Sequence, residues 1–567
     1  MTTRLVPMPT LTLRPVAWLC ALTCVPTVTA QTAPATGNPL NTLPPVQTPQ
    51  PAPAAPVLLP DAELQLSKRL APKLELSTVL QTQRIEIAGV QSIPFDEVAA
   101  LFEPLSGKAV TLEQLALAVQ QAIALYQKAG FPLSFVYLPE QNFAQGIVRI
   151  RAVEGYVHQV NIRGNVGRSE ALLREVAQPL LEDRPLQAEV FTRQTLIMAR
   201  MLHLKVKAQA NLPQTTDGAT PLVLDVEQQP VVFNLNGNFA QSDPKAIANL
   251  TLNDALWAGS QWQFATLLEK PDKERFISAA WNQWLNSQGT TMRLQFSDFK
   301  GRDNFSYAQL NDITSQRKLE WSVSHPLTLA SMTSTIVGAS IYGLNYGKTY
   351  EYQGQSLRYS SQEKVRAFQA NLQWQKTAAQ SSQTAKIAIT QGINGLGAGQ
   401  NQSAELTSNP IRLDFSRLNL DYELRWRFKN LWGAAFATSA QVSPHSLPTS
   451  ERISFGSWRF ARGYRAGEAS GDQGIGVSIE VNRLIPLANQ RWIKSLEPYL
   501  LYEQARTKFQ RKVFASQTLR SSSVGVRFGD QGRYALDLSV AKPQGDRSVF
   551  NPKRALCYNL SLTYQFD

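Results

Sequence analysis

The chain has 567 residues, which is far more than one ordinary domain requires, so it contains several domains or one large architecture. Hydrophobic residues make up 43% of the chain, yet the mean hydropathy is −0.22. Beyond the N-terminus no apolar run reaches the roughly eighteen residues that a membrane-spanning helix requires. The formal charge of +13 raises the question of nucleic acid, but the basic residues recur singly in alternating segments, so no nucleic-acid partner is expected.

The first 30 residues have the layout of a cleavable signal peptide. Arg4 provides a positive flank, a short apolar stretch follows, and small residues end at Ala30, where we expect cleavage. Cys20 and Cys24 lie inside this segment, so only Cys557 remains in the mature chain. A disulfide or a cysteine-based metal site within one chain is therefore not expected.

Two further segments precede the first predicted domain. Residues 31–60 are rich in Pro, Ala, Thr and Gln and too poor in large apolar residues to pack a core, which predicts a stiff, extended linker. Residues 61–81 comprise a helix-compatible segment, Asp61 to Leu70, and a spacer. The helix is interpreted either as a surface helix at a domain edge or as a removable plug for a pore.

Residues 82–230 are typical of two copies of one small α/β unit. In the first copy, 82–155, an alternating strand is followed by two helices and two strands, and the second helix opens with a capping box from Thr111 to Gln114. The same order restarts in the second copy, 156–230. Each copy has about 75 residues, a size that suits small domains on a string.

From residue 231 to 567 the helical period disappears and strict alternation replaces it. The segment 418–428 places Leu, Tyr, Trp and Phe on one face and Asn, Asp, Glu and Arg on the other. The last segment repeats this pattern, with Tyr558, Leu560, Leu562, Tyr564 and Phe566 on its apolar face. Apolar residues outside and polar residues inside indicate a water-filled transmembrane β-barrel, closed by this terminal strand. At roughly 20 residues per strand and loop, the segment allows about 16 strands.

Three stretches carry a resemblance to a known family. The first runs from Tyr126 to Gly155 and contains Gly130, Phe131, Pro139, Gln141 and Glu154. The second runs from Leu447 to Glu480 and contains Arg462, Gly463 and Tyr464, followed by Gly471, Asp472 and Gly474. The third is Glu497 to Glu503, with Val540 to Pro543 and the terminal strand. Together they resemble the two-partner secretion transporters, the haemolysin secretion/activation family, which are outer-membrane barrels with periplasmic POTRA domains.

The resemblance implies a role for each stretch. The residues from Tyr126 to Gly155 fall in the first POTRA domain and imply a region that binds the partner protein. The motif near 447–480 implies a lid loop folded into the barrel. There Arg462 is expected to pair with Glu503, a position where the family usually has Asp, while Gly463 allows a tight turn and Tyr464 adds contact area with a polar tip.

Three classes of function remain to be weighed. An enzyme is not expected, because the four histidines are far apart and no nucleophile or phosphate-loop motif occurs; no cofactor or metal is expected either. A simple porin has no use for a tandem of α/β domains. An assembly factor of the same superfamily, which inserts other barrels, is the alternative to a secretion transporter, but two POTRA units favour secretion.

The partners follow from the preferred function. The resemblance implies a large secreted exoprotein, of the adhesin, haemolysin or contact-dependent toxin class, that threads an outer-membrane barrel from a periplasmic POTRA tandem. The other expected partners are outer-membrane lipid, periplasmic chaperones and the barrel assembly machinery.

Overall fold

The computed structural model describes residues 38–44 and 77–566, apart from residues 144, 202–203, 214, 241–242, 271, 306–309, 353–357, 403–410, 488–489, 491, 512–514, 531 and 549. The predicted signal peptide and the possible plug helix at 61–70 lie outside the described residues. Within the described part of the chain, no helix is both long and apolar enough to cross a membrane.

The first α/β unit has a three-stranded sheet in the order β2-β5-β4, with a separate β1-β3 pair. Its capping box is confirmed: the Thr111 hydroxyl accepts from the Gln114 backbone N–H at 3.2 Å, and the Gln114 side chain accepts from the Thr111 backbone N–H at 3.0 Å. The helices cover an apolar core that includes Phe102, Leu115 and Tyr126. Its elements are β1 (Val79–Gln81), β2 (Arg84–Ala88), α2 (Phe95–Phe102), η2 (Glu103–Leu105), β3 (Ala109–Thr111), α3 (Leu112–Lys128), β4 (Phe135–Tyr137) and β5 (Ile147–Val153).

The second α/β unit has the sheet order β6-β8-β7, with β6 and β8 parallel and β7 and β8 antiparallel. Its fully buried core includes Leu173, Phe191 and Leu222. The two units therefore share one construction, an antiparallel edge strand on a parallel pair with two helices. The elements are β6 (Tyr156–Gly164), η3 (Gly167–Ser169), α4 (Glu170–Glu182), α5 (Ala188–Ala199), β7 (Leu204–Ala210) and β8 (Ala219–Gln228).

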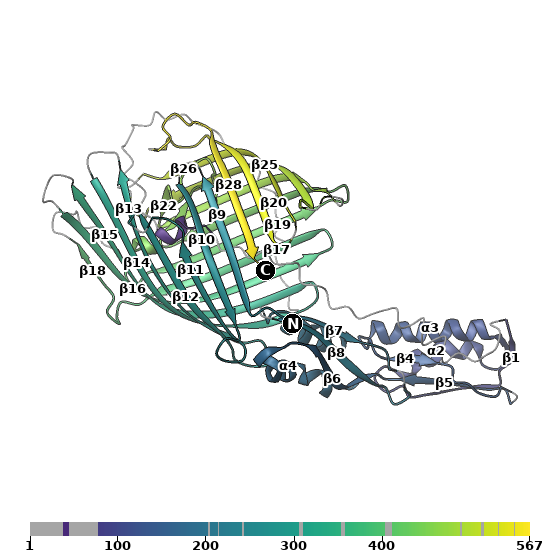
Figure 1. Cartoon of the computed structure of the whole chain (residues 1–567). Coiled ribbons are helices and arrows are strands. Elements are labelled where there is room, and N and C mark those ends of the chain that lie inside the picture. The colour runs from purple at the N-terminus through teal and green to yellow at the C-terminus, as the bar shows by residue number, and fades with distance from the viewer. Residues whose placement is uncertain are drawn as a thin grey trace, which may run out of the picture. The chain divides into compact units, whose positions relative to one another are not determined.

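The rest of the chain forms a closed antiparallel barrel of 16 wall strands, as the sequence predicts (Figure 1). Two short strands, β18 (Gly399–Gln402) and β24 (Ile485–Pro486), extend the wall. The wall strands are β9 (Val231–Ala240), β10 (Asp243–Asn253), β11 (Ser260–Leu267), β12 (Glu274–Trp284), β13 (Thr291–Phe305), β14 (Leu310–Leu329), β15 (Thr333–Tyr352), β16 (Arg358–Ala378), β17 (Ser381–Gly392), β19 (Ser416–Arg427), β20 (Trp432–Val442), β23 (Gln473–Arg483), β25 (Ser495–Lys508), β26 (Gln517–Gly529), β27 (Tyr534–Pro543) and β28 (Cys557–Phe566).

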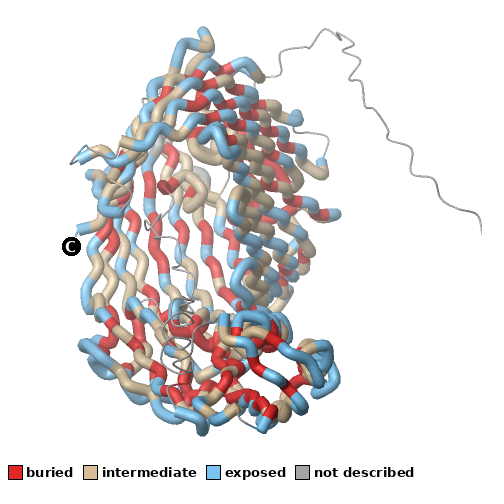
Figure 2. Tube along the Cα trace, turned by 90° about the vertical axis from the view of Figure 1, so that its right-hand side faces the viewer, coloured by how far each residue is buried: buried red, intermediate tan, exposed pale blue. Residues whose placement is uncertain are grey.

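Burial alternates from residue to residue along the wall strands (Figure 2), as expected when side chains point in turn to lipid and to the lumen. On β19, Leu418 and Trp426 are exposed on the outside, whereas Arg417 and Asn419 bond to other side chains in the lumen. Barrel closure comes from β28, which pairs with β9 from Ser561↔Asn238 to Phe566↔Phe233. Because lipid offers no hydrogen-bond partners, this seam satisfies the backbone groups that an open sheet would leave bare.

Residues 38–43 differ from the extended linker that the sequence predicts for 31–60. Pro39–Thr42 form the 3-10 helix η1, which lies among the barrel strands in Figure 1. Asn38 donates to the Ser450 carbonyl at 2.9 Å, and Asn41 donates to the Ser454 hydroxyl at 3.1 Å. Leu43 is 5% exposed and packs against Ile247, Leu267, Phe276 and Phe299 on the lumen wall. The composition argument overlooked that a lumen can bury an otherwise solvated segment through polar side-chain contacts.

The terminal strand gives the first prediction. Leu562→Arg places a charge on the lipid face of β28, at a cost of roughly 2–4 kcal/mol near mid-bilayer. We expect the amount of folded protein in the outer membrane to fall, measured by heat-modifiable migration on gels. Ser561→Arg is the matched control, because Ser561 faces the lumen, where water hydrates the guanidinium; equal losses from both variants would contradict the assigned register.

Candidate functional site

The candidate site is the lumen loop, residues 443–472, which joins β20 to β23 and folds into the barrel. Its two short strands, β21 (Ile453–Phe455) and β22 (Ala469–Gly471), form an antiparallel hairpin in which every residue is buried. The 3-10 helix η4 (Thr449–Glu451) precedes the hairpin. A 16-stranded barrel is too wide for its wall side chains to fill, so this loop occupies space that would otherwise be an open channel.

The tip of the loop turns sharply between the two strands. Gly456, Ser457, Phe460 and Ala461 all have positive φ, at 127°, 52°, 58° and 80°. Three of these residues carry a Cβ, so the tip stores backbone strain that the surrounding contacts must hold. Phe455 and Phe460 meet edge to face, with ring centroids 5.7 Å apart. Both rings pack against Gly476 on the wall strand β23, which anchors the turn.

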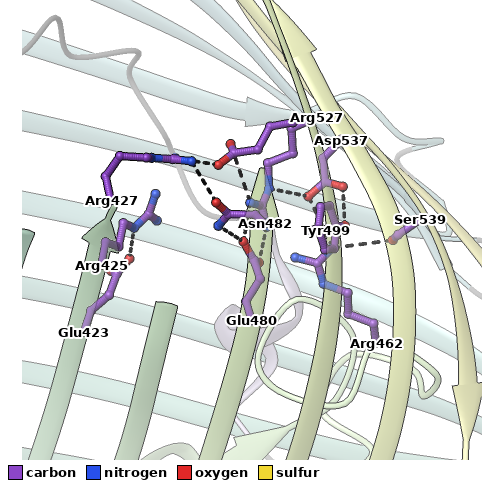
Figure 3. Close-up of polar contacts among 11 residues, drawn as sticks. Glu423, Arg425, Arg427, Arg462, Glu480, Asn482, Tyr499, Arg527, Asp537 and Ser539 are labelled. Atoms are coloured by element: carbon purple, nitrogen blue, oxygen red, sulfur yellow. Dashed lines mark hydrogen bonds and ion pairs between the residues drawn. The ribbon is translucent and has the colours of Figure 1, made fainter. Parts of the chain in front are cut away.

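Arg462 lies in the lumen as predicted, but the partner of its guanidinium is different. The guanidinium Nη1 lies 3.2 Å from the Asp537 carboxylate on β27 and 2.5 Å from the Tyr499 hydroxyl on β25 (Figure 3). Glu503 instead accepts a hydrogen bond from the backbone N–H of Arg462 at 2.8 Å. The predicted side-chain pair of Arg462 and Glu503 is therefore wrong: the carboxylate holds the main chain, and the guanidinium reaches past it.

Glu503 is buried in this position, with 4% of its surface exposed. Its second described donor is the Ser521 hydroxyl on β26, at 3.1 Å. A buried carboxylate is stabilised when donors surround it, and here one donor comes from the loop and one from the wall. Glu503 thus holds the loop backbone at Arg462 against the wall, and it forms no hydrogen bond with the guanidinium of Arg462 in the described structure.

The wall around Arg462 forms a chain of alternating charges (Figure 3). Asp537 is shared between Arg462 and Arg527, which lies 3.3 Å from it. Arg527 also makes a two-pronged contact with Glu480, and Arg427 bonds to Glu497 at 2.7 Å. The guanidinium groups of Arg462 and Arg527 both lie over the Tyr499 ring, 5.5 Å and 4.1 Å from its centroid. The loop arginine is the last member of this chain.

Gly463 and Tyr464 complete the motif. A Cβ at Gly463 would lie 2.8 Å from the backbone nitrogen of Pro543, so the loop approaches the wall more closely than any other residue type allows. The Gly463 carbonyl accepts from the Cys557 thiol at 3.2 Å, which places the terminal strand against the loop. Tyr464 is 3% exposed and donates to the Asp546 carbonyl at 3.0 Å.

The motif flanks hold the base of the loop. Asp472 accepts from the backbone N–H groups of Leu447 and Gln510, both at 2.9 Å. A Cβ at Gly471 would meet the Lys508 backbone at 2.7 Å, and one at Gly474 would meet the Ile453 side chain at 2.9 Å. These residues therefore let the loop re-enter the wall at close range.

Two buried carboxylates fix the opposite side of the loop. Glu451 contacts Arg417 and the Tyr342 hydroxyl, each at 2.9 Å. Glu363 accepts from the backbone N–H of Thr449 at 2.7 Å and from its hydroxyl at 2.9 Å. The loop is thus attached to the barrel on both sides by polar contacts, most of them charged.

A cavity of about 490 Å³ remains beside the loop tip. Trp458, Phe460 and Arg462 line it from the loop, and Glu480 and Arg527 are among the wall residues that line it. The loop therefore narrows the lumen next to the charge chain without filling it.

In the first α/β unit the motif residues are structural. Tyr126 is fully buried and donates to Glu154 at 3.0 Å, and Glu154 also accepts from the backbone N–H groups of Gln91 and Ser92. Burial raises the pKa of Tyr126, and the Glu154 charge raises it further. Burial acts to raise the pKa of Glu154 as well, but the hydrogen bonds from Ser92, Gln91 and Tyr126 outweigh it and lower that pKa below its usual range.

The other members of that motif link chain segments. Gln141 bonds to both backbone groups of Arg149, and Phe131 meets Tyr126 edge to face. The Gly130 carbonyl accepts from Ala188 and the Gly155 carbonyl accepts from Leu186, both in the second unit. Pro139 lies two residues after β4, and its carbonyl accepts from Gln141. Their role in partner binding stays a prediction, and the contacts give each a structural role.

Sequence reasoning missed Asp537, Tyr499 and Arg527. The alternation of β27 does indicate that Asp537 faces the lumen, because its neighbours Leu536 and Leu538 face lipid. What the sequence lacks is the stagger between neighbouring strands, and that stagger decides which lumen carboxylate lies opposite the loop.

Family models match two parts of the chain. Residues 80–155 match the POTRA domain, ShlB-type, and residues 303–528 match the haemolysin secretion/activation protein ShlB/FhaC/HecB. The heme/hemopexin transporter protein HuxB of Haemophilus influenzae is 22% identical over 515 residues, covering 80% of this chain and 81% of that protein.

Solved structures match the fold over most of the chain. CdiB from Escherichia coli has a TM-score of 0.63 at 16% identity, covering 89% of this chain and 96% of that one. BamA from Haemophilus ducreyi, lacking POTRA domains 1–3, has a TM-score of 0.52 at 12% identity, covering 86% and 100%.

The carboxylate of the first unit gives the second prediction. A folded-state pKa below the unfolded value of about 4.3 means that Glu154 stabilises the unit above that pH, and that this stability is lost as the pH falls through the folded pKa. Glu154→Gln should reduce stability at pH 7 by about 1–3 kcal/mol, because the charged acceptor is lost. Amide hydrogen exchange of α3 in the whole protein measures this stability. The difference in protection between the unaltered protein and Glu154→Gln should narrow toward pH 4, and a difference that does not change with pH would contradict the prediction.

The loop contacts give the third prediction. In a Cys557→Ser background, Ser457→Cys puts a thiol at the buried tip, and its labelling rate by a maleimide reports how often the loop leaves the wall. Arg462→Ala and Asp537→Ala should each raise that rate roughly 5- to 150-fold, corresponding to about 1–3 kcal/mol of lost charged hydrogen bonding. Arg425→Ala is the control, because Arg425 bonds to Glu423 on its own strand.

The double variants separate the two carboxylates. Arg462→Ala with Asp537→Ala should be less than additive, because both changes remove one contact. Arg462→Ala with Glu503→Gln should be close to additive, because Glu503 binds a backbone N–H that alanine retains. The reverse pattern would restore Glu503 as the counter-ion of Arg462.

Proposed function

We propose that this chain, a member of the haemolysin secretion/activation protein family, uses the lumen loop as a removable closure on the route of a secreted partner protein. The chain is an outer-membrane transporter of the two-partner secretion type, with its POTRA domains in the periplasm. The observation that carries the proposal is that the loop is held in the lumen chiefly by polar contacts with the wall.

Polar contacts make the closure removable. The ion pair of Arg462 with Asp537 and the hydrogen bonds of Asp472 and Glu451 can be exchanged for bonds to water when the loop moves into a hydrated lumen. The loop shares two apolar clusters with the rest of the barrel. One contains Leu447 of the loop with Tyr342, Leu344, Tyr346, Val365, Ala367 and Phe415. The other contains Ile453, Phe455, Ala461, Tyr464, Ala469, Ala505 and Leu519. Withdrawal of the loop exposes these two clusters, whereas the barrel wall keeps its own hydrogen bonds.

The partner is a secreted exoprotein. We propose that its N-terminal region adds a strand to a POTRA sheet, where β2 and β4 are the edges of one sheet and β6 and β7 are the edges of the other. The partner then threads the barrel unfolded, and its folding outside biases the direction of movement. Adhesin, haemolysin and contact-dependent toxin are all compatible with this route.

Other interactions are part of the same proposal. Outer-membrane lipid contacts the apolar face of the wall, which includes Leu418, Leu500 and Tyr558 among its exposed residues. Periplasmic chaperones and the barrel assembly machinery deliver and insert the chain itself. Activation of the exoprotein, beyond its export, is a separate proposal.

The alternative is a factor that inserts other barrels. Its support is the likeness of fold to BamA, which at 12% identity concerns the fold alone. The two functions differ in what disappears when the chain is absent. Removing a transporter depletes a secreted protein, whereas removing an assembly factor depletes many membrane barrels.

The test follows from this difference. The gene for this chain is deleted from its host. The proteins of the culture medium and of the outer membrane are then compared between the deletion strain and its parent by mass spectrometry. We expect one large protein to leave the medium while outer-membrane barrels stay at their normal levels. Complementation with Arg462→Ala or Asp537→Ala should restore the folded barrel but only part of the secretion, and Arg425→Ala should restore both. Loss of many outer-membrane barrels would favour the assembly factor.

A further inference from the structure

Four asparagines at the start of the barrel have buried amide atoms without partners. Within the described part of the chain, no hydrogen bond reaches Asn234 Oδ1, either amide atom of Asn236, Asn238 Oδ1 or Asn249 Nδ2. Asn234, Asn236 and Asn249 are 1%, 3% and 7% exposed. Unpaired buried amides are rare because each one loses its bonds to water, so a group of four needs an explanation.

These four residues, called here the amide ladder, lie on one lumen surface. Phe233 and Phe239 of β9 are exposed on the lipid side, so Asn234, Asn236 and Asn238 alternate onto the lumen side. Asn249 on β10 pairs directly with Asn234. On the other side, β28 pairs Ser561, Thr563 and Gln565 with Asn238, Asn236 and Asn234. The ladder therefore runs along the closing seam, starting at the end of β9 that follows the α/β units.

The next strands show that unpaired amides are not inherent to this wall. Gln261 donates to Asn253 at 3.0 Å and accepts from Gln263 at 2.7 Å. Arg293 on β13 donates to both Gln263 and Asn282 at 2.8 Å. These amides satisfy one another, whereas the amides of the ladder, in the same sheet, do not. Among the described side-chain amides with unpaired buried atoms, four of six belong to the ladder; Gln194 and Gln316 are isolated.

The spacing of the ladder fits one kind of ligand. Alternate residues of a strand are separated by about 6.6–6.8 Å, which is also the repeat of an extended peptide. Each asparagine presents a carbonyl acceptor and two N–H donors, and each peptide group presents one acceptor and one donor. A polypeptide lying extended along β9 would meet one complementary amide at every second residue, whatever its side chains are.

The far end of the ladder already holds a segment of chain. Lys245 pairs with Asn238 in the register, and its ammonium group donates to the Thr42 hydroxyl at 3.2 Å. Ile247, which pairs with Asn236, packs against Leu43. In the resting protein, residues 38–43 thus occupy the lumen next to the surface that the ladder offers.

We infer that the amide ladder binds the main chain of the exoprotein in extended form as it passes through the lumen. This inference rests on the proposed function and names the chemistry of its route. Neutral amides bind a peptide backbone whatever its side chains are. This suits a transporter, because every segment of the substrate must pass the same surface. Because each bond is individually weak, the substrate exchanges bonds step by step and is not trapped.

The test uses the full-length protein in planar lipid bilayers and an unstructured probe peptide of Gly, Ser and Thr with one charged end, long enough to span the barrel. Current blockades give the residence time of the probe. Asn234→Leu and Asn236→Leu should shorten it, roughly fivefold for each amide lost, and Asn236→Gln should retain most of it. Gln369→Leu is the matched control, because Gln369 is an amide already paired with Thr390, at 3.0 Å on β16 and β17.

A second probe makes the test independent of the variants. The same peptide with N-methyl groups at alternate residues lacks half of its backbone donors but keeps its carbonyl acceptors. It should dwell for less time than the unmodified peptide in the unaltered protein, and Asn236→Leu should shorten its residence less than it shortens that of the unmodified peptide. Polyethylene glycol, a chain without amides, should be insensitive to all variants. Equal residence of both peptides in the unaltered protein would overturn the ladder and leave transport intact. A conducting barrel that no peptide blocks would contradict the proposed function itself.

Discussion

The lumen of a closed 16-stranded barrel is too wide for its own wall side chains to fill, and the rest of the structure depends on what occupies that space. Closure at the β28–β9 seam is obligatory, because lipid cannot satisfy an open sheet edge. A barrier to free diffusion must then come from inside. The lumen loop and residues 38–43 provide part of it, and both are attached by hydrogen bonds or ion pairs to polar groups that the strand alternation directs inward.

The fold could be predicted from the sequence because its main signals are periodic. The alternation of Leu560 and Leu562 with Ser561 determines which face of β28 meets lipid, and the capping box at Thr111 places the start of α3. Such patterns depend only on neighbours along the chain. The number of wall strands follows from length, because the bilayer sets how many residues one strand needs.

The site could be predicted only in part, because contacts across the lumen depend on strand stagger and on side-chain reach. The motif identifies Arg462 as a loop residue that points at a carboxylate, but Glu503, Glu480 and Asp537 all face the same space. The Glu503 carboxylate bonds to the backbone N–H of Arg462, so the guanidinium extends to Asp537 on a strand two places further along the wall. No property of the one-dimensional pattern distinguishes these arrangements.

The sharing of Asp537 between the loop and the wall affects the charge balance of the open pore. With the loop in place, Glu480, Glu497 and Asp537 face Arg427, Arg527 and Arg462, so three negative groups meet three positive ones. When the loop withdraws, Arg462 leaves and the wall patch keeps one uncompensated negative charge, while Glu503 loses its main-chain donor. The vacated wall attracts the basic loop back over roughly 8 Å at physiological ionic strength. Electrostatic attraction therefore draws the displaced loop back to the wall, and added salt weakens this attraction.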